Sequence, residues 1–190
     1  MIILISGVGS TGKTLMAQNL LERYHIPYLS IDHLKMGLYR GDKNCGFTPL
    51  DNTKVIGNNL WPILKGIIKT NIENEQHIII EGCYILPRYL KDFDSKYSEK
   101  IISVFLGFSA NYIQENFEAR IVRYRNAVEL RSYPEERTIK ELITEHKEFK
   151  EHCLQSRVKY FEIKDDYDKE ILEVYDYIDT EKQRRDLTKN

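Results

Sequence analysis

The sequence has few of the features on which zinc-binding, disulfide-linked, membrane-spanning and nucleic-acid-binding proteins depend. Its three cysteines (Cys45, Cys83 and Cys153) are far apart and form no C-x-x-C pair, which excludes a zinc knuckle and gives no basis for a disulfide framework. No apolar run approaches the ~20 residues of a membrane-spanning helix. The formal net charge of −1 provides no general basic surface for nucleic acid. We therefore expect a cytoplasmic protein with reduced cysteines and neither membrane nor nucleic acid as a partner.

The apolar residues that are present predict an α/β fold in a single domain over residues 1–190. Met1–Ser6 reads as a strand because no charged n-region or cleavage site accompanies it. Several runs are apolar almost throughout, as in parallel strands that are buried on both faces. The expected strands are Met1–Ser6, Ile26–Ile31, His77–Glu81, Ile101–Phe108 and a less apolar fifth, Val158–Ile163.

The segments between these strands have helical spacing. Apolar residues from Val55 to Ile67 predict a helix that is kinked at Pro62. Ser132–Glu135 is typical of a capping box, and the helix after it carries an apolar stripe that includes His146. We interpret His146 as a packed residue of this helix rather than a catalytic one.

The segment GVGSTGKT after the first strand fits two nucleotide-binding patterns. It contains G-x-G-x-x-G, the dinucleotide-binding turn, with Asp32 twenty residues beyond the last glycine. It also matches G-x-x-x-x-G-K-[ST], the phosphate-binding P-loop or Walker A pattern. Lys13 and Thr14 favour the P-loop, because a P-loop lysine reaches the β- and γ-phosphates and the following hydroxyl ligates Mg²⁺. The predicted phosphate-binding residues are Gly7, Val8, Gly9, Ser10, Thr11, Gly12, Lys13 and Thr14, with Thr14 also the metal ligand.

Two carboxylates are expected near this loop. Asp32 follows the second strand and Glu81 ends the third, and ligands of parallel α/β sheets bind at the carboxyl edge. We place both strands beside the strand that carries the P-loop. The sequence contains no N-K-x-D motif of the kind that recognises guanine in GTPases, and it is too short for a large ATPase machine.

Arginines cluster after the fourth strand, at positions 120, 123, 125 and 131. Arginine suits bidentate contact with phosphate and with developing transition-state charge. A solvated helix face is the alternative interpretation. We expect Arg120 or Arg123 to contact a phosphate.

These residues together resemble the nucleoside and nucleotide kinase group of P-loop proteins, the adenylate-kinase-like small kinases. The stretch Asp32–Gly37 and the pair Glu81-Gly82 are also similar to 2-phosphoglycerate-kinase-like and zeta-toxin-like members. The chain has Glu81-Gly82 where nucleotide kinases often have Asp-Gly, and it lacks the zinc-type lid of some members.

The resemblance implies a three-layer αβα fold with a five-stranded parallel sheet. Residues 33–72 would form a helical acceptor-binding insert, and residues 115–135 an arginine-bearing lid. ATP and Mg²⁺ would be bound, with Glu81 orienting a metal-bound water or the acceptor. The loop around Lys164–Tyr167 would lie near the adenine.

The function predicted in this way is transfer of the γ-phosphoryl group of ATP to a small-molecule acceptor. The expected catalytic residues are Lys13, Asp32, Glu81, Arg120 and Arg123, and Asp32 and Arg88 would bind the acceptor. We favour a hydroxyl acceptor because Asp32 and Glu81 leave the centre of the site acidic, whereas a phosphate acceptor would need cations such as Arg88. A nucleotide-binding regulatory protein and a toxin-like kinase are the alternatives.

Overall fold

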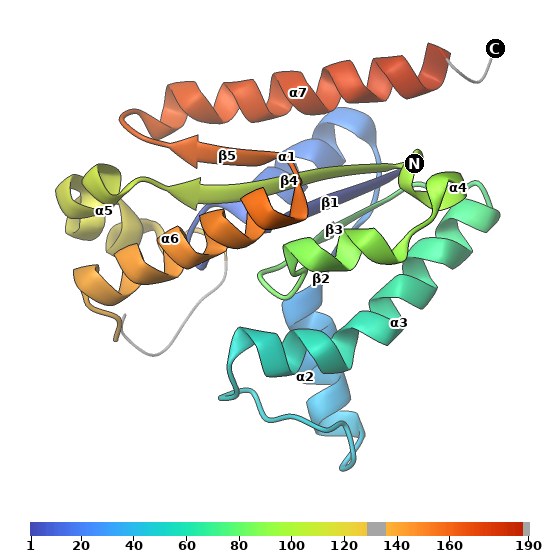
Figure 1. Ribbon diagram of the computed structural model, residues 1–190, viewed down its shortest axis with the longest axis horizontal. Helices are drawn as coiled ribbons and strands as arrows, with labels where there is room; N and C mark the ends of the chain where they lie inside the picture. Colours follow the sequence, from blue (N-terminus) through green and yellow to red (C-terminus); the bar gives the residue numbers. More distant parts are fainter. Residues whose placement is uncertain (129–135, 188–190) are drawn as a thin grey trace.

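The computed structural model describes residues 1–128 and 136–187 (Figure 1). Its centre is a sheet of five parallel strands in the order β2-β3-β1-β4-β5, which confirms the predicted five-stranded parallel sheet. The strands are β1 (Ile2–Gly7), β2 (Tyr28–Ser30), β3 (Ile78–Glu81), β4 (Ile101–Phe108) and β5 (Tyr160–Ile163). The second strand is shorter than expected because Ile31 already begins a helix.

The position of β2 corrects one sequence prediction. Strand β3 lies between β2 and β1, and Glu81 pairs with Ile5 on one side and with Ser30 on the other. The strand before Asp32 is therefore not a neighbour of the P-loop strand. Asp32 itself lies in the first turn of α2 (Ile31–Gly41), so its side chain enters the carboxyl edge from a helix N-terminus.

Helices cover both faces of the sheet, which gives the predicted three-layer arrangement (Figure 1). On one face α1 (Lys13–Tyr24) and α7 (Tyr167–Leu187) pack against Ile3 and Ile5 of β1. On the other face α3 (Thr53–Glu73) packs against Ile2 and Leu4. Alternate residues of one strand thus serve the two cores, as the period of a strand requires.

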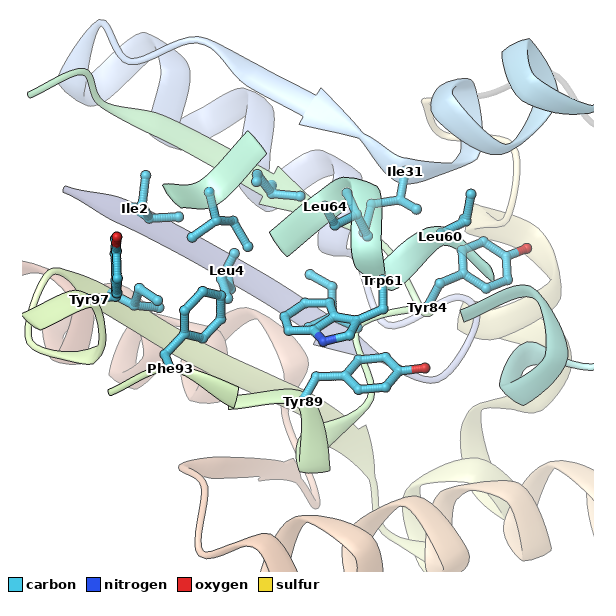
Figure 2. Close-up of a cluster of buried hydrophobic side chains, with 14 of the residues drawn as sticks. Ile2, Leu4, Ile31, Leu60, Trp61, Leu64, Tyr84, Tyr89, Phe93 and Tyr97 are labelled. Atoms are coloured by element: carbon cyan, nitrogen blue, oxygen red, sulfur yellow. The ribbon is translucent and has the colours of Figure 1, made fainter. Parts of the chain in front are cut away.

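The connection between β2 and β3 consists mainly of α2 and α3, which confirms a helical segment there. Helix α3 continues through Pro62. Trp61 of this helix stacks on Tyr89, with ring centroids 4.5 Å apart (Figure 2). Tyr89 belongs to the short helix η1 (Pro87–Asp92), which α4 (Ser95–Ser98) follows.

Beyond β4 the chain forms α5 (Ala110–Asn116) and a π-helical turn η2 (Phe117–Val122), which carries Arg120. Helix α6 (Ile139–Ser156) packs on β4 through Phe149 and Phe105. Its N-terminus is a capping box made by Thr138 and Glu141. The capping box expected at Ser132–Glu135 and the arginine at position 131 lie outside the described residues. No helix in the described part is long and apolar enough to cross a membrane.

Candidate active site

The P-loop lies between the end of β1 and the first turn of α1, as its pattern predicts. Gly12 has φ +81°, and a Cβ atom at this position would lie 1.9 Å from the Tyr167 hydroxyl oxygen. A Cβ atom on Gly7 would lie 2.4 Å from the Leu106 carbonyl oxygen. Both positions therefore require glycine, one for its backbone conformation and both for space. The loop places the first N–H groups of α1 in an arrangement that suits an anion.

The Lys13 side chain is enclosed by this loop. Its Nζ donates to the Val8 carbonyl oxygen at 2.8 Å and to Thr11 Oγ1 at 3.3 Å, and the residue is 8% exposed. A buried ammonium is stable only with such partners. Phosphate oxygens bound at the α1 N-terminus would lie beside this ammonium group.

Thr14 and Glu81 meet at the carboxyl edge of the sheet. Thr14 Oγ1 donates to Glu81 Oε2 at 3.3 Å, and Glu81 is almost fully buried. The described residues contain no cluster of three or more His, Cys, Asp or Glu side chains that could hold a metal. Mg²⁺ is usually held by one or two protein oxygens, waters and substrate phosphates. The pair of hard oxygen donors fits Mg²⁺ that arrives with a nucleotide.

Asp32 is accompanied by a buried lysine. Lys35 Nζ donates to Asp32 Oδ1 at 2.8 Å and to the Tyr84 hydroxyl oxygen at 2.8 Å. Burial, with Cys83 and Asp32 nearby, raises the pKa of Tyr84, so its phenol is neutral. The charge of Lys35 compensates that of Asp32, one of the two carboxylates that we expected to make the centre of the site acidic.

Cys83 lies close to both the P-loop lysine and the Asp32–Lys35 pair. Burial raises the pKa of this thiol, and Lys13, Asp32 and Lys35 all act on it electrostatically. The turn after β3 therefore lies within the field of both the P-loop lysine and the Asp32–Lys35 pair.

A cavity of about 370 Å³ opens beside the P-loop. Arg120 and Arg125 line it, whereas Arg123 does not. Arg120 Nη2 lies 3.3 Å from Asp168 Oδ2, so an ion pair joins η2 to α7 at this cavity. The other lining residues are mostly P-loop and aromatic: Ser10, Gly12, Lys13, Thr14, Leu15, Phe108, Tyr112, Ile121, Tyr124, Ala127, Val128, Tyr167 and Asp168.

The two other predicted arginines do not line the cavity. Arg123 lies over the Tyr124 ring, with its guanidinium carbon 5.8 Å from the centroid. Arg88 is exposed, donates to Asn58 Oδ1 at 2.7 Å and lies over the Tyr89 ring. Among the described residues, Arg88 makes no hydrogen bond or ion pair with Asp32.

Arg137, which the sequence analysis did not select, lies against the P-loop. A Cβ atom on Gly9 would lie 3.2 Å from both terminal nitrogens of this guanidinium. Arg137 Nη1 is also 2.8 Å from Glu145 Oε2. Its position immediately before the capping residue Thr138 is not a pattern that predicts such a contact.

His146 is a packed residue, as expected. Its Nδ1 accepts a hydrogen bond from the Phe108 N–H at 2.8 Å, and its ring stacks on Phe108. Burial, followed by the charges of Lys13 and Arg137, lowers the pKa of His146 to about 3. The imidazole is therefore neutral at physiological pH and supports the end of β4 beside the cavity.

Comparison with known proteins identifies the fold. No family model matches the chain, and no curated protein matches its sequence. A gluconokinase from Sinorhizobium meliloti 1021 is similar in structure at 14% identity, with a TM-score of 0.57 over 99% of this chain and 97% of that one. Shikimate kinase from Aquifex aeolicus has 16% identity and a TM-score of 0.56 over 95% and 97% of the two chains. The chain thus has the fold of the P-loop small-molecule kinases.

Proposed function

We propose that the protein transfers the γ-phosphoryl group of ATP, in the presence of Mg²⁺, to a hydroxyl group of a small molecule. The observation that carries this proposal is the contact between Thr14 and Glu81 beside the enclosed Lys13. In this arrangement the phosphate-binding loop and the two oxygens that would hold Mg²⁺ lie at the same edge of the sheet. The kinase fold supports the same reaction class.

The nucleotide would be bound by residues from three parts of the chain. The P-loop N–H groups and Lys13 would hold the phosphates, because a helix N-terminus and an ammonium both favour anions. The base would occupy the aromatic-lined cavity between Tyr112, Tyr124 and Tyr167. Bound Mg²⁺ would neutralise charge on the phosphate oxygens, and Thr14 and Glu81 would hold it.

The acceptor would approach from the α2 side. Asp32 would accept a hydrogen bond from the acceptor hydroxyl and take up its proton as the oxygen attacks the γ-phosphorus. Arg120 and Arg137 would stabilise the charge that spreads over the transferred group. Little covalent chemistry is required of the protein, so its contribution is positioning and charge stabilisation.

An ATP-consumption screen over hydroxylated and phosphorylated metabolites tests this function. Wild type should consume ATP with at least one hydroxylated compound, and Lys13→Ala should reduce the rate a hundredfold or more, or about 3 kcal/mol. Lys147→Ala, which alters an exposed lysine of α6, is the matched control. ATP binding without transfer to any acceptor would favour a nucleotide-binding regulatory protein instead.

The acceptor type is tested by a pair of variants. Asp32→Asn should keep ATP binding and reduce transfer to a hydroxyl by roughly a hundredfold. If Asp32→Asn is nearly as active as wild type while Arg88→Ala no longer binds the acceptor, the acceptor is a phosphate and the hydroxyl proposal is wrong.

A further inference from the structure

Lys35 is a buried lysine to which the proposed reaction assigns no part. Its side chain is 11% exposed, although it belongs to α2 at the periphery of the fold. Burying an ammonium is costly, and lysines are almost never buried unless they are paired. Both of its hydrogen-bond partners, Asp32 and Tyr84, belong to the turns that follow β2 and β3 at the carboxyl edge of the sheet.

Tyr84 contacts the lysine through both its hydroxyl group and its ring. The Lys35 Nζ atom lies 2.8 Å from the Tyr84 hydroxyl oxygen and 5.0 Å from the centroid of the ring. The backbone of Tyr84 packs closely on α3, since a Cβ atom on Gly57 would lie 2.9 Å from its carbonyl oxygen. Figure 2 shows Tyr84 at the border of the apolar cluster, with its hydroxyl directed away from that cluster. The ring therefore anchors a polar group outside the core.

The Asp32 carboxylate is held by the fold and is also partly open to solvent. Oδ1 accepts the hydrogen bond from Lys35, and the Tyr84 hydroxyl also interacts with this carboxylate. The Asp32 side chain is 36% exposed, three times the fraction of its partner. The carboxylate is thus tied to the fold through Oδ1, and its side chain is exposed enough to meet a ligand.

We propose that Lys35, held by Tyr84, is a positioning residue that orients the Asp32 carboxylate toward the acceptor hydroxyl. The proposal rests on the phosphotransfer function above and adds a second consequence. Because the ammonium compensates the carboxylate charge, an acceptor that carries its own negative charge is not repelled from Asp32. Hydroxy compounds with an acidic group are therefore compatible with this site.

Three variants test the role of Lys35. Lys35→Met should lower kcat for the best hydroxylated acceptor roughly ten- to a hundredfold, because a misplaced catalytic group costs about that much. KM for ATP should stay within about twofold, since the P-loop is not altered. Lys35→Arg should recover part of the lost kcat, and Tyr84→Phe should lose part of it. Lys147→Met, which alters an exposed lysine of α6, is the control.

Crystal structures of wild type and Lys35→Met, both with ATP and Mg²⁺, provide a readout that needs no acceptor. The Asp32 side chain should adopt a different rotamer in Lys35→Met from the one that it has in wild type. An unchanged Asp32 rotamer, or an unchanged kcat, would overturn the proposal. If wild type phosphorylates no acceptor, the proposed function fails, while the Asp32 rotamer still decides the role of Lys35. If Lys35→Met does not fold, the same structures and kinetics of Lys35→Arg and Tyr84→Phe decide it.

Discussion

His146 makes the stability of the protein depend on pH in a way that can be calculated. The pKa of this imidazole is about 3 in the folded chain, against 6.5 for an unperturbed histidine. Below pH 6.5 the unfolded chain therefore takes up a proton that the folded chain does not. The free energy of unfolding then falls by about 1.4 kcal/mol for each pH unit, until the pH approaches the folded pKa. By pH 5 the loss is about 2 kcal/mol.

The variant His146→Asn isolates this contribution. An asparagine oxygen can accept the hydrogen bond from the Phe108 N–H that Nδ1 now accepts, but asparagine does not titrate. The variant should be less stable than wild type at pH 8, because the stacking of the ring on Phe108 is lost. Between pH 8 and pH 5 the difference in unfolding free energy should shrink by about 2 kcal/mol.

Urea denaturation followed by circular dichroism at pH 8, 7, 6 and 5 measures this difference directly. Carboxylates that titrate elsewhere contribute equally to both proteins and cancel. His152→Asn provides the matched control, since His152 is an exposed histidine of the same helix and its variant should follow wild type at every pH. A difference between wild type and His146→Asn that does not change with pH would refute the neutral, buried assignment.

Three further outcomes are expected. Gly12→Ala should abolish ATP binding in calorimetry while the chain stays folded, because the new methyl group would collide with the Tyr167 hydroxyl. Glu81→Gln should raise the Mg²⁺ concentration that half-maximal transfer needs, because the carboxylate beside Thr14 loses its charge; an unchanged Mg²⁺ titration would contradict this role. Glu170 accepts hydrogen bonds from three backbone N–H groups of residues 164–166, which outweigh the effect of burial and lower its pKa. Glu170→Gln should therefore lose about 1–2 kcal/mol at pH 7 by urea denaturation, and the loss should disappear as the pH falls below the folded pKa of this carboxyl group.

The P-loop could be predicted because its information is local. Eight consecutive residues determine the turn, the cation and the hydroxyl, and the apolar run before them determines the strand. The pairing order of the strands is not local in this sense. Nothing in the sequence around Asp32 shows that β3 inserts between β2 and β1, because that order depends on contacts between distant segments.

Tyr84 and Arg137 were not predicted for the same reason. Tyr84 reaches Lys35 across 49 positions of the chain, and Arg137 reaches the P-loop from the start of α6. A tyrosine after a strand, or an arginine before a capping residue, has no pattern of its own. Residues three apart on a helix are neighbours, so the contact between Asp32 and Lys35 follows once both lie on one helix. We expected the helical insert to begin at residue 33, after Asp32, and therefore did not predict this contact.

Trp61 gives the protein a built-in optical reporter for the packing of α3 against η1. It is the single tryptophan of the chain, stacked on Tyr89, and its Nε1 donates to Asp92 at 2.7 Å. The cavity beside the P-loop is lined instead by tyrosine and phenylalanine. Excitation at wavelengths that tyrosine does not absorb therefore reads the environment of α3 and η1 alone. Emission that responds to an acceptor, and not to a nucleotide, would show which compound moves these helices.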